Sequence, residues 1–279
     1  MYLASYNYFM CHIKEIQLIT SIIILLSSLF YYIYYSKKYQ NSKNKWLLPF
    51  LNSSMLVFLC IGLHQFFEFL SLLTKNLLIY KIGLIISVSA VYFLLKSLEN
   101  LSNKNINSWI AIIPIGIVAL QIAFAPMKFS EANFYLQHNS AFFWAATWLF
   151  LFVYWHVCAF KIYSESDNKS KKTLITYLLT IADVSFILST IYVLVGYFFF
   201  SVNVCTDSPS VWCTFYVVQA FLIPILFFKL GKSFNRNNKP TKITTKQTII
   251  YLIISLVILI LMISTLSPFN CLTWKFIFP

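Results

Sequence analysis

An apolar run from Leu47 to Leu73 is the feature that most constrains what this chain can fold into. A helix needs about 20 consecutive apolar residues to cross a hydrocarbon layer of about 30 Å, and several other runs in the chain approach or exceed that length. The chain is 59% hydrophobic and only 10% charged, whereas soluble domains are about 45–50% apolar and about 25% charged. The sequence therefore predicts an integral membrane protein, an all-α polytopic transmembrane helical bundle.

We expect eight membrane-spanning helices, with seven as the alternative, in a single transmembrane domain over residues 1–279. The polar segments between the runs, including 96–108, 126–140 and 161–173, are interpreted as loops, and they are too short to form a folded domain outside the bilayer. The predicted helices cover residues 16–35, 47–73, 77–95, 109–125, 141–160, 174–200, 211–228 and 248–266.

The basic residues give an orientation. The loops after the first, third, fifth and seventh predicted helices carry most of the 21 Lys and Arg residues. Loops of this kind face the cytoplasm, so both termini are predicted to be non-cytoplasmic. The same distribution accounts for the net charge of +13, which leaves no support for a nucleic-acid partner. Membrane lipids are the expected partners, and anionic lipids attract basic loops.

The six cysteines show no CxxC pair and no metal-type spacing, so no metal site is predicted. The orientation places Cys205, Cys213 and Cys271 at the non-cytoplasmic face, where an oxidising compartment permits disulfides. Cys205 with Cys271 or Cys213 is a candidate disulfide, and the alternative is that all three are free, small apolar residues. Cys60 and Cys158 lie inside predicted helices and are expected to serve packing.

Glu68 and Asp183 are the only carboxylates inside the predicted spans. A carboxylate at a helix centre costs about 2.5–3.5 kcal/mol on insertion scales, so such residues face the bundle or a wet cavity and mark function. His64 and Glu68 are four residues apart and share one helix face, where they can hold one proton or ion between them. At about 1.5 Å of rise per residue, His64 and Asp183 lie at a similar level near the midplane.

Three glutamines fall at comparable depths. We expect a polar pocket in the outer half of the bundle, formed by the predicted helices 47–73, 109–125, 174–200 and 211–228. The alternative is an interhelical hydrogen-bond network that only orients the helices. His156, next to Trp155, is interpreted as an interfacial residue. The predicted pocket residues are His64, Gln65, Glu68, Asp183, Gln121 and Gln219.

Three short motifs occur in order along the chain: Met10-Cys11, His64-Gln65-Phe66-Phe67-Glu68 and Val211-Trp212-Cys213-Thr214-Phe215. In these motifs the chain resembles a family of uncharacterised bacterial multi-pass membrane proteins. Those proteins open with Met-Cys-Phe-Ser and carry Gln-Gln-x-x-Glu-Gly in an early helix and Trp-Cys-x-Phe in a late one. The resemblance implies no activity. It implies a start at Met10 rather than Met1, and one constellation made of Gln65, Glu68, Trp212 and Cys213.

These features predict a multi-pass protein of the bacterial cytoplasmic (inner) membrane that binds, senses or translocates a small ligand, ion or proton. No cofactor is predicted. The alternatives are a membrane-embedded hydrolase or transferase acting on lipid, and a structural membrane subunit. The sequence favours a non-enzymatic role, because it carries no HExxH motif. His64, Glu68 and Asp183 also lack a second histidine at their level, and three such residues make a weak metal site.

Overall fold

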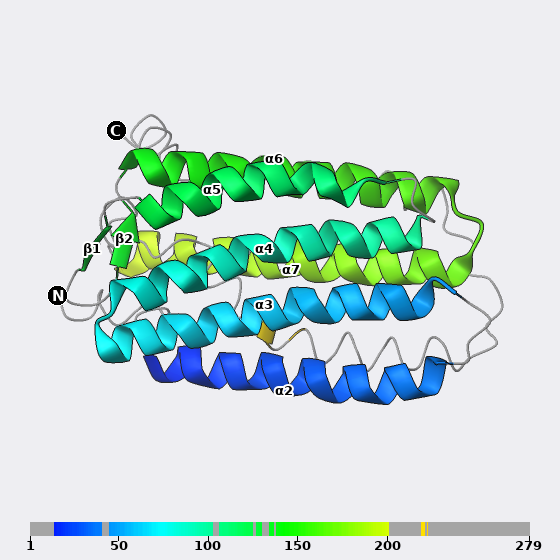
Figure 1. Cartoon of the computed structure of the whole chain (residues 1–279), viewed down its shortest axis with the longest axis horizontal. Helices are drawn as coiled ribbons and strands as arrows, with labels where there is room; N and C mark the ends of the chain where they lie inside the picture. The colour runs from blue at the N-terminus through cyan, green and yellow to red at the C-terminus, as the bar shows by residue number, and fades with distance from the viewer. Residues whose placement is uncertain are drawn as a thin grey trace.

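The computed structural model describes residues 14–40, 45–102, 106–124, 127–129, 134–136, 138–200, 219–220 and 222. This part of the chain is helical apart from one short hairpin, so the predicted helical fold is confirmed at that level (Figure 1). The helices are α2 (Lys14–Tyr39), α3 (Leu47–Thr74), α4 (Leu77–Leu101), η2 (Ser108–Ala111), α5 (Ile112–Phe124), α6 (His138–Glu165) and α7 (Lys169–Phe200). The strands are β1 (Met127–Phe129) and β2 (Phe134–Leu136), which pair antiparallel.

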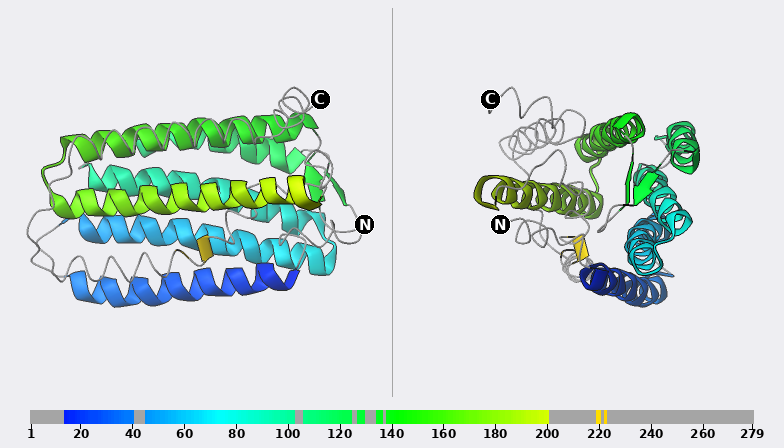
Figure 2. Two further views of the ribbon diagram at one scale, coloured as in Figure 1. Left: turned by 180° about the vertical axis from the view of Figure 1, so that it is seen from behind. Right: turned by 90° about the vertical axis from the view of Figure 1, so that its left-hand side faces the viewer.

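The long helices run side by side along the long axis of the molecule. In the end-on view of Figure 2, α2, α3, α4 and α5 follow one another along a curved layer, and α6 and α7 lie to one side of it. Helix α3 packs between α2 and α4, and α4 also contacts α6. The polar side chains of α3 are therefore enclosed by its two neighbours.

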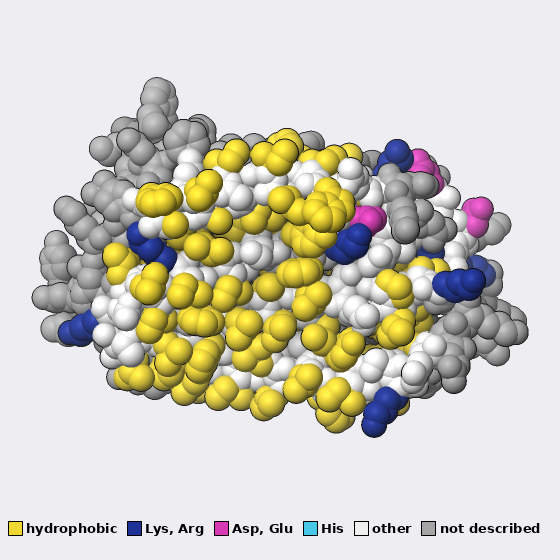
Figure 3. Space-filling view, viewed as in Figure 1, with side chains coloured by type: hydrophobic (Ala, Val, Ile, Leu, Met, Phe, Trp, Pro, Cys, Tyr) yellow, Lys and Arg dark blue, Asp and Glu magenta, His cyan; other side chains and the backbone are white. Residues whose placement is uncertain are grey.

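Within the described residues, three helices are long and apolar enough to cross a membrane. The candidate spans are Gln17–Lys37, Leu47–Thr74 and Leu77–Leu101, and Ser108–Phe124 is a shorter apolar helix. Hydrophobic side chains cover the middle of the face shown in Figure 3, and charged side chains gather toward its two ends. Phe124 is 83% exposed and Ile113 is 73% exposed. Apolar surface of this extent is typical of a face that meets lipid or a partner.

A tight turn joins α3 to α4. Lys75 ends α3 in a left-handed conformation with φ 53°, a common way for a helix to terminate. The side chain of Asn76 then accepts hydrogen bonds from the backbone N–H groups of Leu78, at 2.9 Å, and Ile79, at 3.4 Å, which satisfies donors that the first turn of a helix leaves unpaired. The two residues thus fold α3 and α4 into an antiparallel pair.

Two glycines allow the helices to approach closely. A Cβ on Gly62 would lie 2.7 Å from Leu25 of α2, and a Cβ on Gly83 would lie 3.0 Å from the Cβ of Phe67 of α3. The hydroxyl of Ser21 donates to the carbonyl oxygen of Gly62 at 3.0 Å across the first of these contacts. Small residues at such crossings are the usual means by which membrane helices pack tightly.

Several helix ends differ from the predictions, most of all in α4, α6 and α7. Helix α4 continues past the predicted end at residue 95 to Leu101, α6 continues to Glu165, and α7 begins at Lys169, so the predicted loops 96–108 and 161–173 are wrong over much of their length. Polar residues at these ends find partners in the helical conformation: the Asn168 side chain accepts from the backbone N–H of Lys171 at 3.2 Å. The predicted loop 126–140 contains the hairpin of β1 and β2.

The predicted helix 248–266 lies outside the described residues, as does most of 211–228. Gln219, Ala220 and Leu222 are described, and all three are helical. Both views show this short piece beside the middle of α2 and α3 (Figures 1 and 2).

Candidate functional site

Helix α3 carries the polar cluster that the sequence predicts at His64, Gln65 and Glu68. Their exposed fractions are 5%, 1% and 2%, so all three are buried among the helices. Four residues of separation place His64 and Glu68 on one side of α3, and this expectation is met, because His64 Nε2 lies 3.8 Å from Glu68 Oε2.

The His64 ring is anchored by the neighbouring helix. Its Nδ1 lies 3.1 Å from the carbonyl oxygen of Gly83 on α4. A carbonyl only accepts hydrogen bonds, so Nδ1 carries the hydrogen and Nε2 is the nitrogen that gains or loses a proton. Because Nε2 faces the carboxyl of Glu68, the backbone of Gly83 determines which ring nitrogen meets the acid.

The carboxyl of Glu68 is linked to α2 through Gln65. Gln65 Nε2 donates to Glu68 Oε2 at 3.4 Å, and Thr20 Oγ1 on α2 lies 3.5 Å from Gln65 Oε1. The Ser71 hydroxyl donates to the backbone oxygen of Glu68 at 2.7 Å. A chain of polar groups therefore runs from α2 through α3 to α4, entirely among buried side chains.

The separation of His64 and Glu68 decides what the pair can do. A direct N–H···O hydrogen bond spans about 2.7–3.2 Å, so 3.8 Å is long for one and suits an interaction through a bridging water or ligand atom. With one shared proton the pair is neutral overall, as an imidazole beside a carboxylic acid or as an imidazolium beside a carboxylate. This arrangement can hold a proton or a small polar ligand at low electrostatic cost.

A second histidine–carboxylate pair lies between α6 and α7. His156 Nε2 is 3.0 Å from Asp183 Oδ1, and both residues are buried, with exposed fractions of 8% and 4%. The ring of His156 is buried between the helices, with the ring of Trp155 nearly perpendicular to it at 4.8 Å between ring centroids, and its interpretation as an interfacial residue stays a prediction. Asp183 thus has a partner that the sequence did not assign to it, and its contact with the α3 cluster stays a prediction.

The two predicted pocket glutamines on other helices are also placed. Gln121 is half-buried on α5, and Gln219 is buried in the short helical piece beside α2 and α3. In each glutamine, the buried side-chain Oε1 accepts no hydrogen bond from any described residue, so it remains available to accept one. The candidate disulfide cysteines, Cys205, Cys213 and Cys271, lie outside the described residues, as do Trp212 and Cys213 of the late motif.

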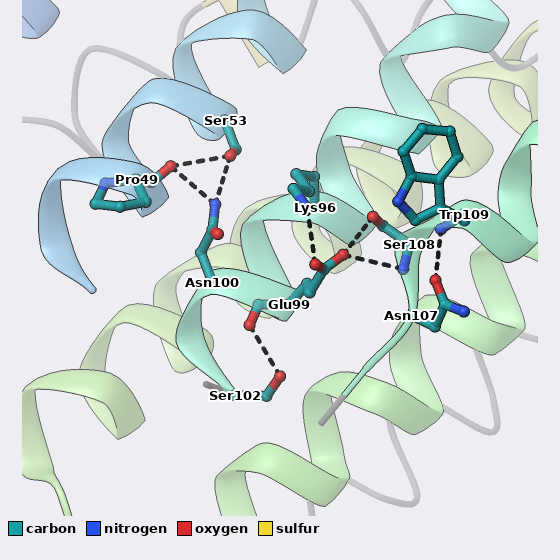
Figure 4. Close-up of polar contacts among 9 residues, drawn as sticks. All are labelled: Pro49, Ser53, Lys96, Glu99, Asn100, Ser102, Asn107, Ser108 and Trp109. Carbon is teal, nitrogen blue, oxygen red and sulfur yellow. Dashed lines mark hydrogen bonds and ion pairs between the residues drawn. The ribbon is translucent and has the colours of Figure 1, made fainter. Parts of the chain in front are cut away.

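A buried carboxylate that the sequence analysis missed lies at the other end of α4. Glu99 accepts from Lys96 Nζ at 2.7 Å and from both the backbone N–H, at 3.1 Å, and the hydroxyl of Ser108 (Figure 4). Beside it, Asn100 Nδ2 donates to Ser53 Oγ at 2.8 Å and to the Pro49 oxygen at 3.0 Å. These hydrogen bonds tie α3, α4 and η2 together.

Lys171 joins the same end of the bundle to α7. Its Nζ donates to the backbone oxygen of Leu101 and lies 5.4 Å from the centroid of the Trp46 ring. Burial lowers the pKa of this lysine below its ordinary value because desolvation disfavours the charged form. The side chain therefore fastens α7 to the end of α4.

The polar residues of α2 carry a signal that sequence reasoning overlooked. Gln17, Thr20 and Ser21 are spaced by three and four residues and are all buried, which is the pattern of one polar helix face. That spacing in an apolar run predicts a polar contact with another helix. The pairing of His156 with Asp183 had no such local signal, because the two residues are 27 apart in the sequence.

The comparisons give no relative against which to read this site. No protein-family model matches the chain, and searches of curated proteins and of solved structures found no significant similarity. Within the described part of the chain, no group of three or more His, Cys, Asp and Glu side chains is placed to hold a metal ion. The geometry of the two histidine–carboxylate pairs thus carries the functional argument.

Proposed function

We propose that this chain is a multi-pass protein of the bacterial cytoplasmic membrane, and that its α3 cluster binds or senses a proton, a small ion or a small polar ligand. The observation that carries the proposal is the pair of His64 Nε2 and Glu68 Oε2, buried and 3.8 Å apart. An ionisable group at bilayer depth is expensive and is therefore a functional candidate.

The anchoring of His64 supports this role. Gly83 accepts from Nδ1, which keeps Nε2 directed at Glu68, so the ring nitrogen and the acid that exchange the proton are held opposite each other. A network that merely oriented helices would need only closed hydrogen bonds. At 3.8 Å the pair lacks a direct hydrogen bond, so a water or ligand atom that lies beside the two groups can interact with both.

The arrangement of the helix ends supports a multi-pass topology. The end of α2, the start of α3, the end of α4 and the α6–α7 turn lie together at one end of the bundle (Figure 1). That end includes Lys37, Lys45, Lys161, Lys169 and Lys172, as expected for a cytoplasmic surface. The opposite end carries Lys14, Lys75, Lys81 and Lys128, and the larger number of basic residues at the first end supports the proposed orientation.

Proton uptake by the purified full chain in lipid nanodiscs tests the proposal. On lowering the pH, we expect the wild-type protein to take up roughly one proton per chain more than Glu68→Gln, which should fold with normal yield, because the other ionisable groups titrate in both proteins. Glu99→Gln is the matched control, because Glu99 is also a buried glutamate on a neighbouring helix but is closed by Lys96 and Ser108. Uptake that is unchanged in Glu68→Gln would remove the site.

A further inference from the structure

The hydroxyl of Thr20 has two acceptors within reach and one hydrogen to give. Thr20 Oγ1 lies 3.0 Å from the backbone oxygen of Gln17 and 3.5 Å from Gln65 Oε1. A hydroxyl donates one hydrogen and accepts through its lone pairs. When Thr20 donates to Gln17, it is left as an acceptor toward Gln65.

The amide of Gln65 can face its neighbours in either of two ways. As placed, Oε1 faces Thr20 and Nε2 donates to Glu68 Oε2 at 3.4 Å. A half-turn of the amide exchanges its donor and acceptor ends while leaving the polar positions nearly unchanged. Oε1 then faces Glu68, and Nε2 faces Thr20.

These two orientations match the two protonation states of Glu68. We infer that the ligand of the α3 cluster is a proton held on Glu68, and that the Gln65 amide turns over when Glu68 binds it, which passes the change to Thr20 on α2. The inference rests on the proposed function, since it identifies the ligand of that site.

Without the proton, the Glu68 carboxylate accepts from Gln65 Nε2, and Thr20 donates to Gln65 Oε1. With the proton on Oε2, Glu68 donates to Gln65 Oε1, Gln65 Nε2 donates to Thr20 Oγ1, and Thr20 donates to the Gln17 oxygen. The proton reaches Oε2 from water or from His64 Nε2, which is then neutral, and no other covalent bond changes. A fixed amide would instead turn its N–H toward the O–H on Oε2, so that two hydrogen-bond donors face each other.

The described parts of α2, α3 and α4 around the cluster carry few other titratable groups. Between Gln17 and Ser28, α2 has no ionisable side chain, and α3 offers only Cys60 and His64 besides Glu68. The ionisable residues near Gly83 on α4 are Tyr80 and Lys81, and Lys81 Nζ donates to the Ala123 oxygen of α5 at 2.7 Å. Among the described residues, His64 is therefore the titratable side chain placed to face Glu68.

Infrared difference spectroscopy of the full chain in nanodiscs, recorded as a function of pH, tests the inference. We expect a carboxylic-acid C=O band to appear on acidification and glutamine side-chain amide bands to shift with the same midpoint. Glu68→Gln should remove the Glu68 part of the carboxylic-acid band and the amide shift, while the other carboxyl groups still titrate. Gln65→Leu should keep the carboxylic-acid band and abolish the amide shift. Thr20→Val should alter the amide bands of both forms, and Thr20→Ser should restore them.

The outcomes separate the inference from the proposed function. A Glu68 band that titrates without an amide shift overturns the amide turnover and leaves proton binding intact. An amide shift that persists in Glu68→Gln, or amide bands that are unchanged in Thr20→Val, also overturns it. The absence of any carboxyl band that depends on Glu68 overturns the assignment of the proton, while the proton-uptake comparison of Glu68→Gln with Glu99→Gln separately decides the proposed function.

Discussion

The two histidine–carboxylate pairs of this protein have the same chemistry and different geometry. His64 and Glu68 lie on one helix with 3.8 Å between Nε2 and Oε2, whereas His156 and Asp183 lie on two helices with 3.0 Å between Nε2 and Oδ1. The second distance is a closed hydrogen bond and the first is not. We interpret the pair between α6 and α7 as a structural contact that holds the two helices together, and the pair on α3 as a binding site for a proton or ligand.

The neighbours reinforce this contrast. The α3 pair is surrounded by groups that can both donate and accept, such as Gln65 and Thr20, which can follow a change of protonation. His156 is packed against the aromatic ring of Trp155. A site that gains and loses a proton needs neighbours that both donate and accept, because its protonated and its deprotonated form must each have hydrogen-bond partners.

The largest expected effect is on the pair between α6 and α7. Asp183→Ala should lower the free energy of unfolding by about 3 kcal/mol, because removing one partner of a buried ion pair leaves the other uncompensated. Denaturant titration of the purified protein measures this value. Asp183→Asn is the control, since its amide still reaches His156 and should cost much less. A loss below about 1 kcal/mol for Asp183→Ala would show that this pair does not fasten the helices.

An intermediate effect is expected where α4 approaches the α3 pair. A Cβ on Gly83 would lie 3.0 Å from the Phe67 Cβ and 3.6 Å from His64 Nδ1, so Gly83→Ala should destabilise the fold by about 1–3 kcal/mol, as overpacking does. It should also reduce proton uptake. Gly116→Ala is the matched control, because nothing lies within 4 Å of its Cβ position. Equal stability of the two variants would contradict the close approach of α3 and α4.

Double-mutant cycles compare the two pairs directly. We expect a coupling of about 1–2 kcal/mol between His156 and Asp183, in the range found for residues in contact. We expect a smaller coupling between His64 and Glu68, because 3.8 Å is too long for a direct hydrogen bond. Unfolding free energies of the single and double alanine variants give both numbers. A larger coupling for the α3 pair than for the α6–α7 pair would contradict the assignment of the α6–α7 pair to stability and of the α3 pair to binding.

The smallest effect on stability is expected at Lys171. Its titration at alkaline pH distinguishes the pH response of the helix ends from that of the α3 pair. Burial lowers the pKa of Lys171 from its ordinary 10.5, so the unfolded chain binds more protons than the folded one between the two values. Stability should therefore rise as the pH increases through the folded pKa toward 10.5. Lys171→Met should remove this alkaline rise and leave the acidic proton uptake unchanged. An unaltered alkaline stability profile in this variant would contradict the burial of Lys171.

Local information was enough for much of α3. Its predicted range, 47–73, and its observed range, Leu47–Thr74, nearly coincide, because a long apolar run bounded by polar residues specifies a helix wherever it packs. The same locality placed His64 and Glu68 on one face. Helix ends were harder to predict. From the sequence, Lys96 and Glu99 suggested a loop after residue 95, whereas in the structure both belong to α4 and Glu99 accepts from the backbone N–H of Ser108.

The sequence by itself determined that the chain forms long apolar helices and that His64, Gln65 and Glu68 share one of them, since helix periodicity connects residues a few positions apart. Only the tertiary structure decided the partners across helices: His156 for Asp183, Gly83 for His64, and Thr20, 45 residues away, for Gln65. Such contacts depend on how helices are rotated and how closely they approach, which glycines such as Gly62 and Gly83 permit. No local pattern encodes that rotation, and it is what distinguishes a closed pair from an open one.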